Sequence, residues 1–432
     1  MRPLSFKRRS PDELTRCAFG LLWLRDASGG EAMSQYVLNS LAILLSVVLL
    51  IPTAVLAVEC FASSLRVQRK LRQRGTVRPT VGIIVPAHNE ELQILDAVQN
   101  IKRQMHKGDR LVVVADNCSD LTASLARDAE VEVIERFDAD HRGKGYALAA
   151  AIRYLAEAPP EVAVVIDADC WLEPGALDEL AYMTAATNRP SQSRYLMIAP
   201  HNAGINLAVS EFAFLLKNRI RLLGLSKLGL PAQLTGSGMA FPWTILQNAQ
   251  LANGNLVEDM KLGLDLACTG HAALFCDAAV VKSTFPYSRD GLRAQASRWD
   301  TGRFALTRSL LSALTCASTF RKKDYIALVV DALVPPLTLQ AALLFLALVA
   351  SAGLATSGML NFPLLICIAN VLIFGMTLIV IWWLHGRTVL PLRTMIQIPG
   401  YVADKLRLYP RHIFAPVSTQ WVRTDRNRPT GM

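Results

Sequence analysis

The sequence predicts an α/β protein, with a mostly parallel, Rossmann-like sheet in a cytosolic domain and transmembrane α-helices on either side of it. Between residues 78 and 310, short β-branched runs alternate with amphipathic stretches, a pattern typical of a parallel sheet covered by helices. Longer apolar runs flank this region, and about 20 such residues suffice to cross a membrane. The composition agrees, because 52% hydrophobic residues among 432 exceeds the content of an ordinary soluble chain.

Three transmembrane helices are predicted, at residues 37–62, 326–354 and 362–384. The second run contains Asp331 and Pro335-Pro336, so it is either kinked or begins at the membrane surface. Intramembrane acids are rare. Asp331 therefore either faces protein or lies at the level of the lipid headgroups.

Basic residues gather beside the apolar runs. The net charge is +10, and the basic linker 63–77 and basic tail 385–432 hold much of the excess. Lys and Arg favour the cytosolic side and attract anionic lipid. We therefore expect a multi-pass protein of the inner (plasma) membrane, with a cytoplasmic catalytic domain, membrane lipid as a partner and no nucleic-acid partner.

The N-terminal tail, residues 1–36, conflicts with this orientation, because a single first span would place its basic residues outside. We expect the true start to be Met33, which leaves almost nothing to translocate; peptides from upstream of Met33 in the native protein would contradict this. The eight cysteines include no Cys-x-x-Cys pair. This spacing indicates reduced thiols rather than a zinc site or a disulfide framework.

Strands are expected at residues 81–85, 111–115, 131–134 and 162–166, each a short apolar run. Helices are expected between them, at 90–102, 121–129 and 145–155. Ligands of such sheets bind at the carboxyl ends of the strands. Polar motifs stand at these ends: Pro86, Asn89 and Glu90 after the first strand, Asp116 after the second, and Asp167 with Asp169 after the fourth.

Asp167-Ala168-Asp169 is a candidate metal site. Carboxylates together with phosphate oxygens suit Mg²⁺ or Mn²⁺, and such an ion stabilises a leaving nucleoside diphosphate. The alternative is that these acids cap a helix beginning near Pro174.

Asp116 and Lys144 are candidates for binding a nucleotide. The Asp116 carboxylate can accept hydrogen bonds from a base or ribose, or it can form an Asx turn with Asn117. Lys144 lies between two glycines at the start of a helix, which suits a phosphate or the acidic rim. The spacing differs from that of a P-loop.

Glu258 and Asp259 open a predicted helix and follow the small-residue loop 235–239, where glycine allows backbone to approach a ligand. Asp259 can act as a general base that takes a proton from an attacking sugar hydroxyl. Both acids can instead simply stabilise the helix dipole.

Gln295, Arg298 and Trp299 share one face of a predicted amphipathic helix, since residues three and four apart are neighbours. Arg can neutralise a diphosphate and a sugar can stack on indole. The alternative is an interfacial helix whose Trp marks the headgroup level.

These motifs, in this order, resemble those of the family 2 glycosyltransferases of the GT-A fold. The resemblance covers about residues 78–310. It points in particular to the membrane-bound branch that includes cellulose, hyaluronan and poly-N-acetylglucosamine synthases. Val257-Glu258-Asp259 is similar to the family's Thr-Glu-Asp, with Val for Thr, and residues 295–299 match Gln-x-x-Arg-Trp.

The resemblance implies a role for each site residue. Asp116 resembles the nucleotide-binding aspartate, and Asp169, with Asp167, the metal-binding pair. Asp259 is implied as the base, beside Glu258. The residues implied to lie beside the acceptor and the diphosphate are Gln295, Arg298 and Trp299. Those implied to line the nucleotide are Pro86, Asn89, Glu90, Lys144 and Asp167.

The expected function is therefore metal-dependent, inverting transfer of a sugar from a UDP-sugar to a lipid-linked or polysaccharide acceptor, in bacterial exopolysaccharide or cell-surface glycan synthesis. Processive relatives surround a channel with more than three spans. This difference favours single transfer. The alternative is a processive polysaccharide synthase, which the Gln-x-x-Arg-Trp motif favours, if the chain borrows spans from a partner subunit or forms a homo-oligomer. A catalytically silent membrane-anchored binding protein is the alternative from another class, but it predicts loss of an acid at Asp169 or Asp259.

Overall fold

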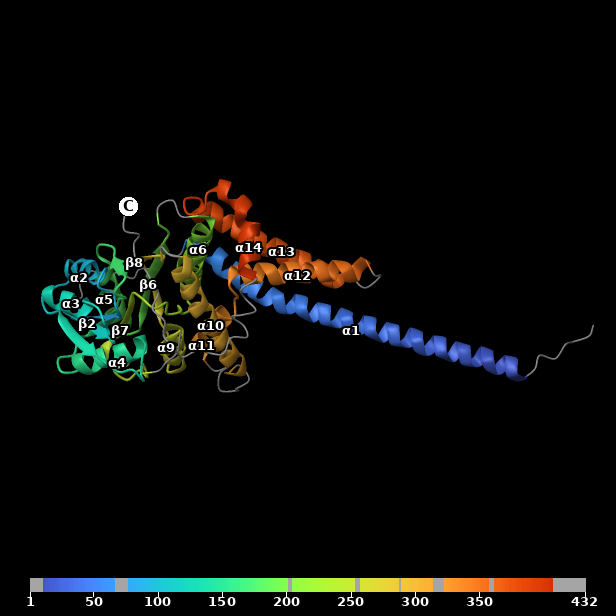
Figure 1. The fold of residues 1–432 in the computed structure, drawn as a ribbon, viewed down its shortest axis with the longest axis horizontal. Helices are drawn as coiled ribbons and strands as arrows, with labels where there is room; N and C mark the ends of the chain where they lie inside the picture. Colours follow the sequence, from blue (N-terminus) through green and yellow to red (C-terminus); the bar gives the residue numbers. More distant parts are fainter. Residues whose placement is uncertain are drawn as a thin grey trace, which may run out of the picture. The chain divides into compact units, whose positions relative to one another are not determined.

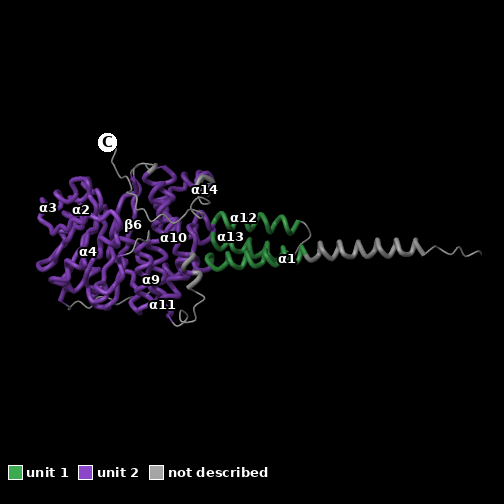
Figure 2. Tube along the Cα trace, turned by 60° about the horizontal axis from the view of Figure 1, so that its bottom comes forward, with its two compact units in different colours: residues 1–53, 341–374 green, residues 54–340, 375–432 purple. Residues whose placement is uncertain are grey.

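The structure is a computed structural model (Figure 1), which describes residues 11–66, 77–200, 204–252, 257–286, 289–313, 322–356 and 361–406. The chain forms two compact units (Figure 2): unit 1 is Met1–Thr53 with Ala341–Phe374, and unit 2 is Ala54–Gln340 with Gly375–Met432. Most of the predicted basic linker, the start of the N-terminal tail and the end of the basic C-terminal tail lie outside the described residues.

Unit 2 contains a sheet of eight strands in the order β3-β2-β1-β4-β7-β6-β8-β5. The strands are β1 (Val81–Ala87), β2 (Arg110–Asp116), β3 (Glu132–Arg136), β4 (Val162–Val165), β5 (Cys170–Leu172), β6 (Ser191–Ile198), β7 (Met239–Pro242) and β8 (Leu274–Thr284). Strands β1 to β4 are parallel neighbours, β7 is antiparallel to β4 and β6, and β5 is antiparallel to β8. The predicted mostly parallel sheet is confirmed.

Helices cover both faces of the sheet, because alternate residues of a strand point to opposite sides. Ile83 of β1 belongs to one buried cluster and Ile84 to the other. The first face packs against α2 (Ile94–Lys102), α3 (Thr122–Asp128) and α5 (Ala176–Thr187), and the second against α4 (Lys144–Leu155), α8 (Trp243–Leu246) and α9 (Glu258–Cys268) (Figure 1). This arrangement leaves the carboxyl ends of β1, β2 and β4 together at one edge.

Two helix starts differ from the prediction. The helix expected from Glu90 begins at Ile94, because the backbone N–H of Glu90 donates to Thr122 Oγ1 at 2.7 Å and its carbonyl accepts from the following turn. The helix expected from Gly145 begins at Lys144, just after Gly143, whose φ of 129° is a conformation open to glycine.

Unit 2 also contains further helical segments. They are α6 (Ile205–Leu215), the π-helix η1 (Leu216–Arg221), α7 (Leu222–Lys227), α10 (Arg289–Ala313), α11 (Lys323–Ala332), the π-helix η3 (Trp382–Gly386), the 3₁₀ helix η4 (Leu392–Gln397) and α14 (Ile398–Leu406). The segments α6, η1 and α7 follow one another without a break. Leu328 and Val329 of α11 are fully buried against α9 and α10 in one apolar cluster.

Three described helices are long and apolar enough to cross a membrane: Ser34–Ser63 within α1 (Pro11–Ser63), Leu337–Thr356 (α12), and Phe362–Gly386, which comprises α13 (Phe362–Ile381) and η3. Inside unit 1 their contacts are partly polar. Asn370 Nδ2 donates to the Ser46 carbonyl at 3.0 Å, and Ser46 Oγ lies 3.2 Å from Cys367 Sγ. Such bonds between apolar helices stabilise their packing where no water competes.

The predicted span 326–354 is two helices rather than one. Pro335-Pro336 separates α11 from α12, since proline lacks the N–H that a continuing helix needs. Residues up to Ala332 pack on α9 and α10, so the apolar helix of membrane-spanning length begins at Leu337. Asp331 accordingly faces protein, with 8% of its surface exposed.

Asp331 belongs to a buried ion cluster that joins three segments of unit 2. Arg221 Nε donates to Glu59 Oε2 of α1 at 2.5 Å, and Arg221 Nη2 donates to Asp331 Oδ1 at 2.6 Å. Burial lowers the pKa of Arg221, but Asp331 and Glu59 more than offset this and raise it above its ordinary value, so the guanidinium stays charged. A Cβ on Gly224 would stand 1.8 Å from the Glu59 carbonyl oxygen, so only glycine allows α7 to approach α1 this closely.

Arg221→Met should destabilise the protein by about 3–5 kcal/mol, because two carboxylates would remain buried without a cation. Thermal unfolding in detergent measures the loss. Arg127→Met removes one partner of a surface ion pair with Glu135 and should cost at most about 1 kcal/mol.

The triple variant Glu59→Gln, Arg221→Met, Asp331→Asn removes all three charges and should recover much of that stability. An Arg221→Met protein as stable as the wild type would show that the cluster does not hold α1 to unit 2.

Candidate active site

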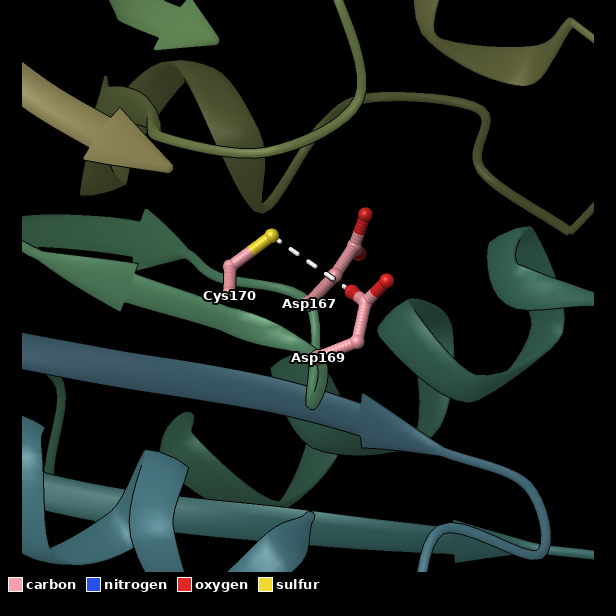
Figure 3. Close-up of side chains that lie close together, drawn as sticks. All are labelled: Asp167, Asp169 and Cys170. Carbon is pink, nitrogen blue, oxygen red and sulfur yellow. Dashed lines mark hydrogen bonds between the residues drawn. The ribbon is translucent and has the colours of Figure 1, made fainter. Parts of the chain in front are cut away.

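The two acids of the Asp-x-Asp motif lie in the turn between β4 and β5. Figure 3 shows the carboxyl groups of Asp167 and Asp169 projecting to the same side of this turn, with the Cys170 thiol beside them. One carboxylate oxygen of each acid and Cys170 Sγ all lie within 4.8 Å of one another. The turn is held from below, since the backbone N–H of Asp167 donates to Ser237 Oγ at 3.1 Å.

These acids do not cap the helix that follows. Helix α5 begins at Ala176 with Gly175 as its N-cap, and no side chain caps it. Strand β5 intervenes between the motif and the helix. The alternative role of the motif as a helix cap is therefore excluded.

The donor set fits a hard divalent cation. Carboxylate oxygens are the ligands that Mg²⁺ and Mn²⁺ prefer, whereas a thiol suits softer metals. Burial raises the pKa of Cys170 to about 12, and its Sγ donates to Asp169 Oδ1 at 3.4 Å. Asp167 and Asp169 are thus the residues that would hold the ion, and Cys170 orients one of them.

Lys144 links this turn to the loop before β7. Its ammonium group donates to Asp167 Oδ1 and, at 2.6 Å, to the carbonyl oxygen of Gly236. Burial lowers the pKa of Lys144, but Asp167 and Glu258 outweigh it and raise the pKa above its ordinary value. Lys144 was predicted to bind either a phosphate or the acidic rim of the site. In the structure it is a charged group that connects Asp167 with the Gly236 carbonyl at that rim.

Asp259 reaches the same loop from the first turn of α9, where it was predicted to lie. Gly236 has a φ of 94°, and a Cβ built there would lie 3.4 Å from Asp259 Oδ2 and 4.0 Å from Lys144 Nζ. Burial raises the pKa of Asp259, while Lys217 lowers it in part. Burial, with the charge of Asp259, also raises the pKa of Glu258 to about 7. Desolvated carboxylates of this kind are suited to accepting a proton.

The Gln-x-x-Arg-Trp motif lies on α10. Burial lowers the pKa of Arg298, and the charges of Glu258 and Asp167 partly oppose this. Gln295 is buried, and Trp299 packs on the core of the sheet with its ring 6.0 Å from that of Phe214. Trp299 is thus anchored in the domain, rather than standing alone at headgroup level.

Asp116 ends β2 at the adjoining part of the edge. Its Oδ1 accepts from Arg136 Nη1 at 2.6 Å and from Asn117 Nδ2 at 3.1 Å, so it forms more than a local Asx turn. The Nδ1 atom of His88, the residue after β1, lies 2.6 Å from the Asp116 carbonyl oxygen.

The residues predicted after β1 hold the neighbouring loops. Asn89 Oδ1 accepts from the Ser119 N–H at 2.7 Å, and Glu90 bonds to Thr122 as described above. Pro86 lies within β1, beside Val114 of β2.

Sequence reasoning missed two side chains of this region. Arg136 neutralises Asp116, and nothing in the sequence links residues 20 positions apart on different strands. Lys217 acts on Asp259 from η1, where its run of apolar neighbours suggests an ordinary amphipathic helix. The feature that points to Lys217 is the π-helix that carries it, because such helices are often found at functional sites. This π-helix is visible only in the structure.

The fold is that of the GT-A glycosyltransferases. The mannosyltransferase PcManGT of Pyrobaculum calidifontis, solved with GDP-Man and Mn²⁺, has a similar structure, with a TM-score of 0.55 at 19% identity over 87% of this chain and 99% of that one. Glucosyl-3-phosphoglycerate synthase of Mycobacterium tuberculosis, solved with Mn²⁺, UDP and phosphoglyceric acid, has a TM-score of 0.33 at 19% identity. The comparison covers 52% of this chain and 78% of that one, and so low a TM-score supports no conclusion.

The sequence itself assigns the family. A model described as glycosyltransferase like family 2 matches residues 79–302, so the chain belongs to that family. An uncharacterized protein of Methanocaldococcus jannaschii is 33% identical over 87 residues, 20% of this chain. The match spans only about a third, 34%, of that curated relative.

Asp169→Asn should weaken Mn²⁺ binding about tenfold or more, because it removes a charged ligand of a hard cation. Electron paramagnetic resonance of free Mn²⁺ during titration measures this, with UDP or GDP present. Asp128→Asn, at the exposed end of α3, removes the same charge elsewhere and should bind as the wild type does. Equal affinity of Asp169→Asn and wild type would remove Asp169 from the site.

Proposed function

We propose that this protein is a membrane-embedded, metal-dependent glycosyltransferase that moves a sugar from a nucleotide-sugar donor, a UDP-sugar, to a lipid-linked or glycan acceptor. One observation carries the proposal: Lys144 and the Gly236 backbone hold the acidic pair at the end of β4 beside Asp259 of α9. Family membership and the GT-A fold support it. Retention of every acid argues against a catalytically silent binding protein.

The proposed reaction is a single displacement. An ion held by Asp167 and Asp169 supplies charge stabilisation for the diphosphate leaving group. Asp259 takes the proton of the acceptor hydroxyl as its oxygen bonds to the anomeric carbon, and the bond from that carbon to the diphosphate breaks. Attack opposite the leaving group inverts the anomeric configuration. Arg298, near Glu258 and Asp167, is placed to neutralise the diphosphate.

In this proposal, the nucleoside part of the donor binds at the edge of the sheet formed by the ends of β1 and β2. Asp116 is buried and fixed by Arg136, and the loop after β1 is pinned to the loop after β2 by Asn89 and Glu90. A fixed carboxylate and rigid backbone suit recognition of a base or ribose, because little entropy is lost on binding.

The proposed place in the inner membrane is supported by the three helices of membrane-spanning length and by the basic residues that flank them. We propose that unit 2 lies in the cytoplasm, where nucleotide sugars are made, and that the product is a cell-surface glycan or exopolysaccharide precursor. Three candidate spans among the described residues favour single addition over processive synthesis. A partner subunit or a homo-oligomer would be needed to complete a channel.

Membranes containing the protein, given radiolabelled UDP- and GDP-sugars with Mn²⁺ or Mg²⁺, should transfer one sugar into a lipid-extractable product. Label in a high-molecular-weight polymer would show processive synthesis instead. Absence of any donor turnover across the panel would contradict the proposed function.

Asp259→Asn should leave donor binding within about twofold but lower transfer about 10²–10⁴-fold, the range lost with a general base. Equilibrium binding of nucleotide and single-turnover transfer measure the two effects. Asp265→Asn lies on the same helix in an exposed pair with Lys261, and should retain transfer. Collapse of donor affinity in Asp259→Asn would assign Asp259 to the donor rather than to the acceptor.

A further inference from the structure

The loop 235–238, just before β7, makes two of the contacts that hold the acidic turn after β4. The Gly236 carbonyl accepts from Lys144, which also donates to Asp167. Ser237 Oγ accepts from the backbone N–H of Asp167 at 3.1 Å. The side chain and the backbone of this acid are therefore both tied, directly or through Lys144, to one short loop.

The backbone of this loop needs support from outside it. Gly236 and Gly238 have φ values of 94° and 68°. Glycine adopts such a conformation without strain, but it is also the residue with the most backbone freedom to lose. A Cβ on Gly238 would stand 1.8 Å from Ser193 Oγ, so the end of the loop lies directly on β6. Strand β6 is thus the surface on which the loop rests.

One side chain of β6, that of Gln192, brackets the loop. Its Oε1 accepts from the backbone N–H of Thr235 at 2.9 Å, and its Nε2 donates to the carbonyl oxygen of Ser237 at 2.9 Å. Its Nε2 also donates to the carbonyl oxygen of Ser193 at 3.0 Å. A single amide group therefore holds the two residues that flank Gly236.

Gln192 can act on the site only through this loop. The residue is fully buried, at 0% exposure, so its side chain touches neither solvent nor a substrate. Its amide bonds to backbone groups of the loop and of β6, and the loop in turn contacts Lys144 and Asp167. Removal of the amide would leave a buried N–H and a buried carbonyl without their partner, and both would shift to find another.

We propose that Gln192 is a positioning residue of the donor site, which fixes the loop 235–238 where Lys144 and Asp167 require it. Groups that orient a metal ligand tune the metal affinity, and loss of such a group typically costs about 10–100-fold. Gln192 belongs to none of the motifs recognised in the sequence. The inference rests on the proposed function, because it assigns a further role within the same site.

Gln192→Met keeps the length of the side chain and removes its hydrogen bonds. The Mn²⁺ affinity of the full-length protein in detergent, measured with UDP present by electron paramagnetic resonance of the free ion, should fall about tenfold or more. Gln233→Met is the matched control, since Gln233 is 3% exposed and donates to the Leu328 carbonyl of α11 at 3.0 Å. This control should bind Mn²⁺ as the wild type does, with a comparable loss of thermal stability.

Gln192→Glu gives a second readout, which also decides the question if Gln192→Met does not fold. Burial raises the pKa of the introduced carboxyl. While protonated, this group can donate to the Ser237 carbonyl as the amide does, and once ionised it can only accept. The Mn²⁺ affinity, divided by that of the wild type at the same pH, should be near one at about pH 6 and fall about tenfold by about pH 9. The added negative charge alone would attract Mn²⁺ and change this ratio in the opposite direction.

Two results would overturn the inference: a Gln192→Met protein with the Mn²⁺ affinity of Gln233→Met, or a Gln192→Glu ratio that stays constant over this pH range. Either would make Gln192 a residue that serves stability alone. The binding measurements need no turnover. A protein that binds Mn²⁺ through this loop but transfers no sugar would refute the proposed function and leave the positioning role of Gln192 standing.

Discussion

The ammonium group of Lys144 is the contact on which the site depends. It joins the first turn of α4 to Asp167 at the end of β4 and to the Gly236 carbonyl before β7, three segments far apart in the sequence. Without this cation, the half-buried Asp167, Glu258 and Asp259 would repel one another. With it, the proposed metal-binding edge and the proposed proton acceptor can occupy one site.

A second buried cation, Arg221, joins η1 to the end of α1 and to α11. Arg221 pairs with Glu59 of α1 and with Asp331 of α11, and the absent Cβ of Gly224 lets α7 approach α1. The same π-helix carries Lys217 toward Asp259. One irregular helical segment thus carries both Lys217 and Arg221, because the extra residue of a π-turn redirects side chains that a regular helix would spread over several faces.

Much of this arrangement follows from the sequence. Apolar runs predicted the parallel strands, and because parallel strands end at one edge, Asp116, Asp167 and Asp169 were correctly brought together there. The split between α11 and α12 was signalled by Pro335-Pro336. Contacts between distant segments were not predictable: the Arg136–Asp116 pair, the Glu59–Arg221–Asp331 cluster and the role of Lys217 arise from tertiary packing, which leaves no periodic trace. The acceptor decides whether the chain belongs to the polysaccharide synthase branch, and the local sequence motifs do not identify the acceptor.

The central claim is that donor and acceptor chemistry meet at the Gly236 backbone, and one pair of variants tests it most directly. Gly236 and Gly229 both have positive φ, 94° and 74°, so alanine at either costs similar backbone strain, about 1–2 kcal/mol. A Cβ on Gly229 would meet nothing within 4 Å, whereas one on Gly236 would enter van der Waals contact with Asp259 Oδ2 at 3.4 Å and with Lys144 Nζ at 4.0 Å. When the two variants are measured side by side, the transfer rate should fall about tenfold or more in Gly236→Ala and stay near that of the wild type in Gly229→Ala. Equal rates in the two variants would contradict the account.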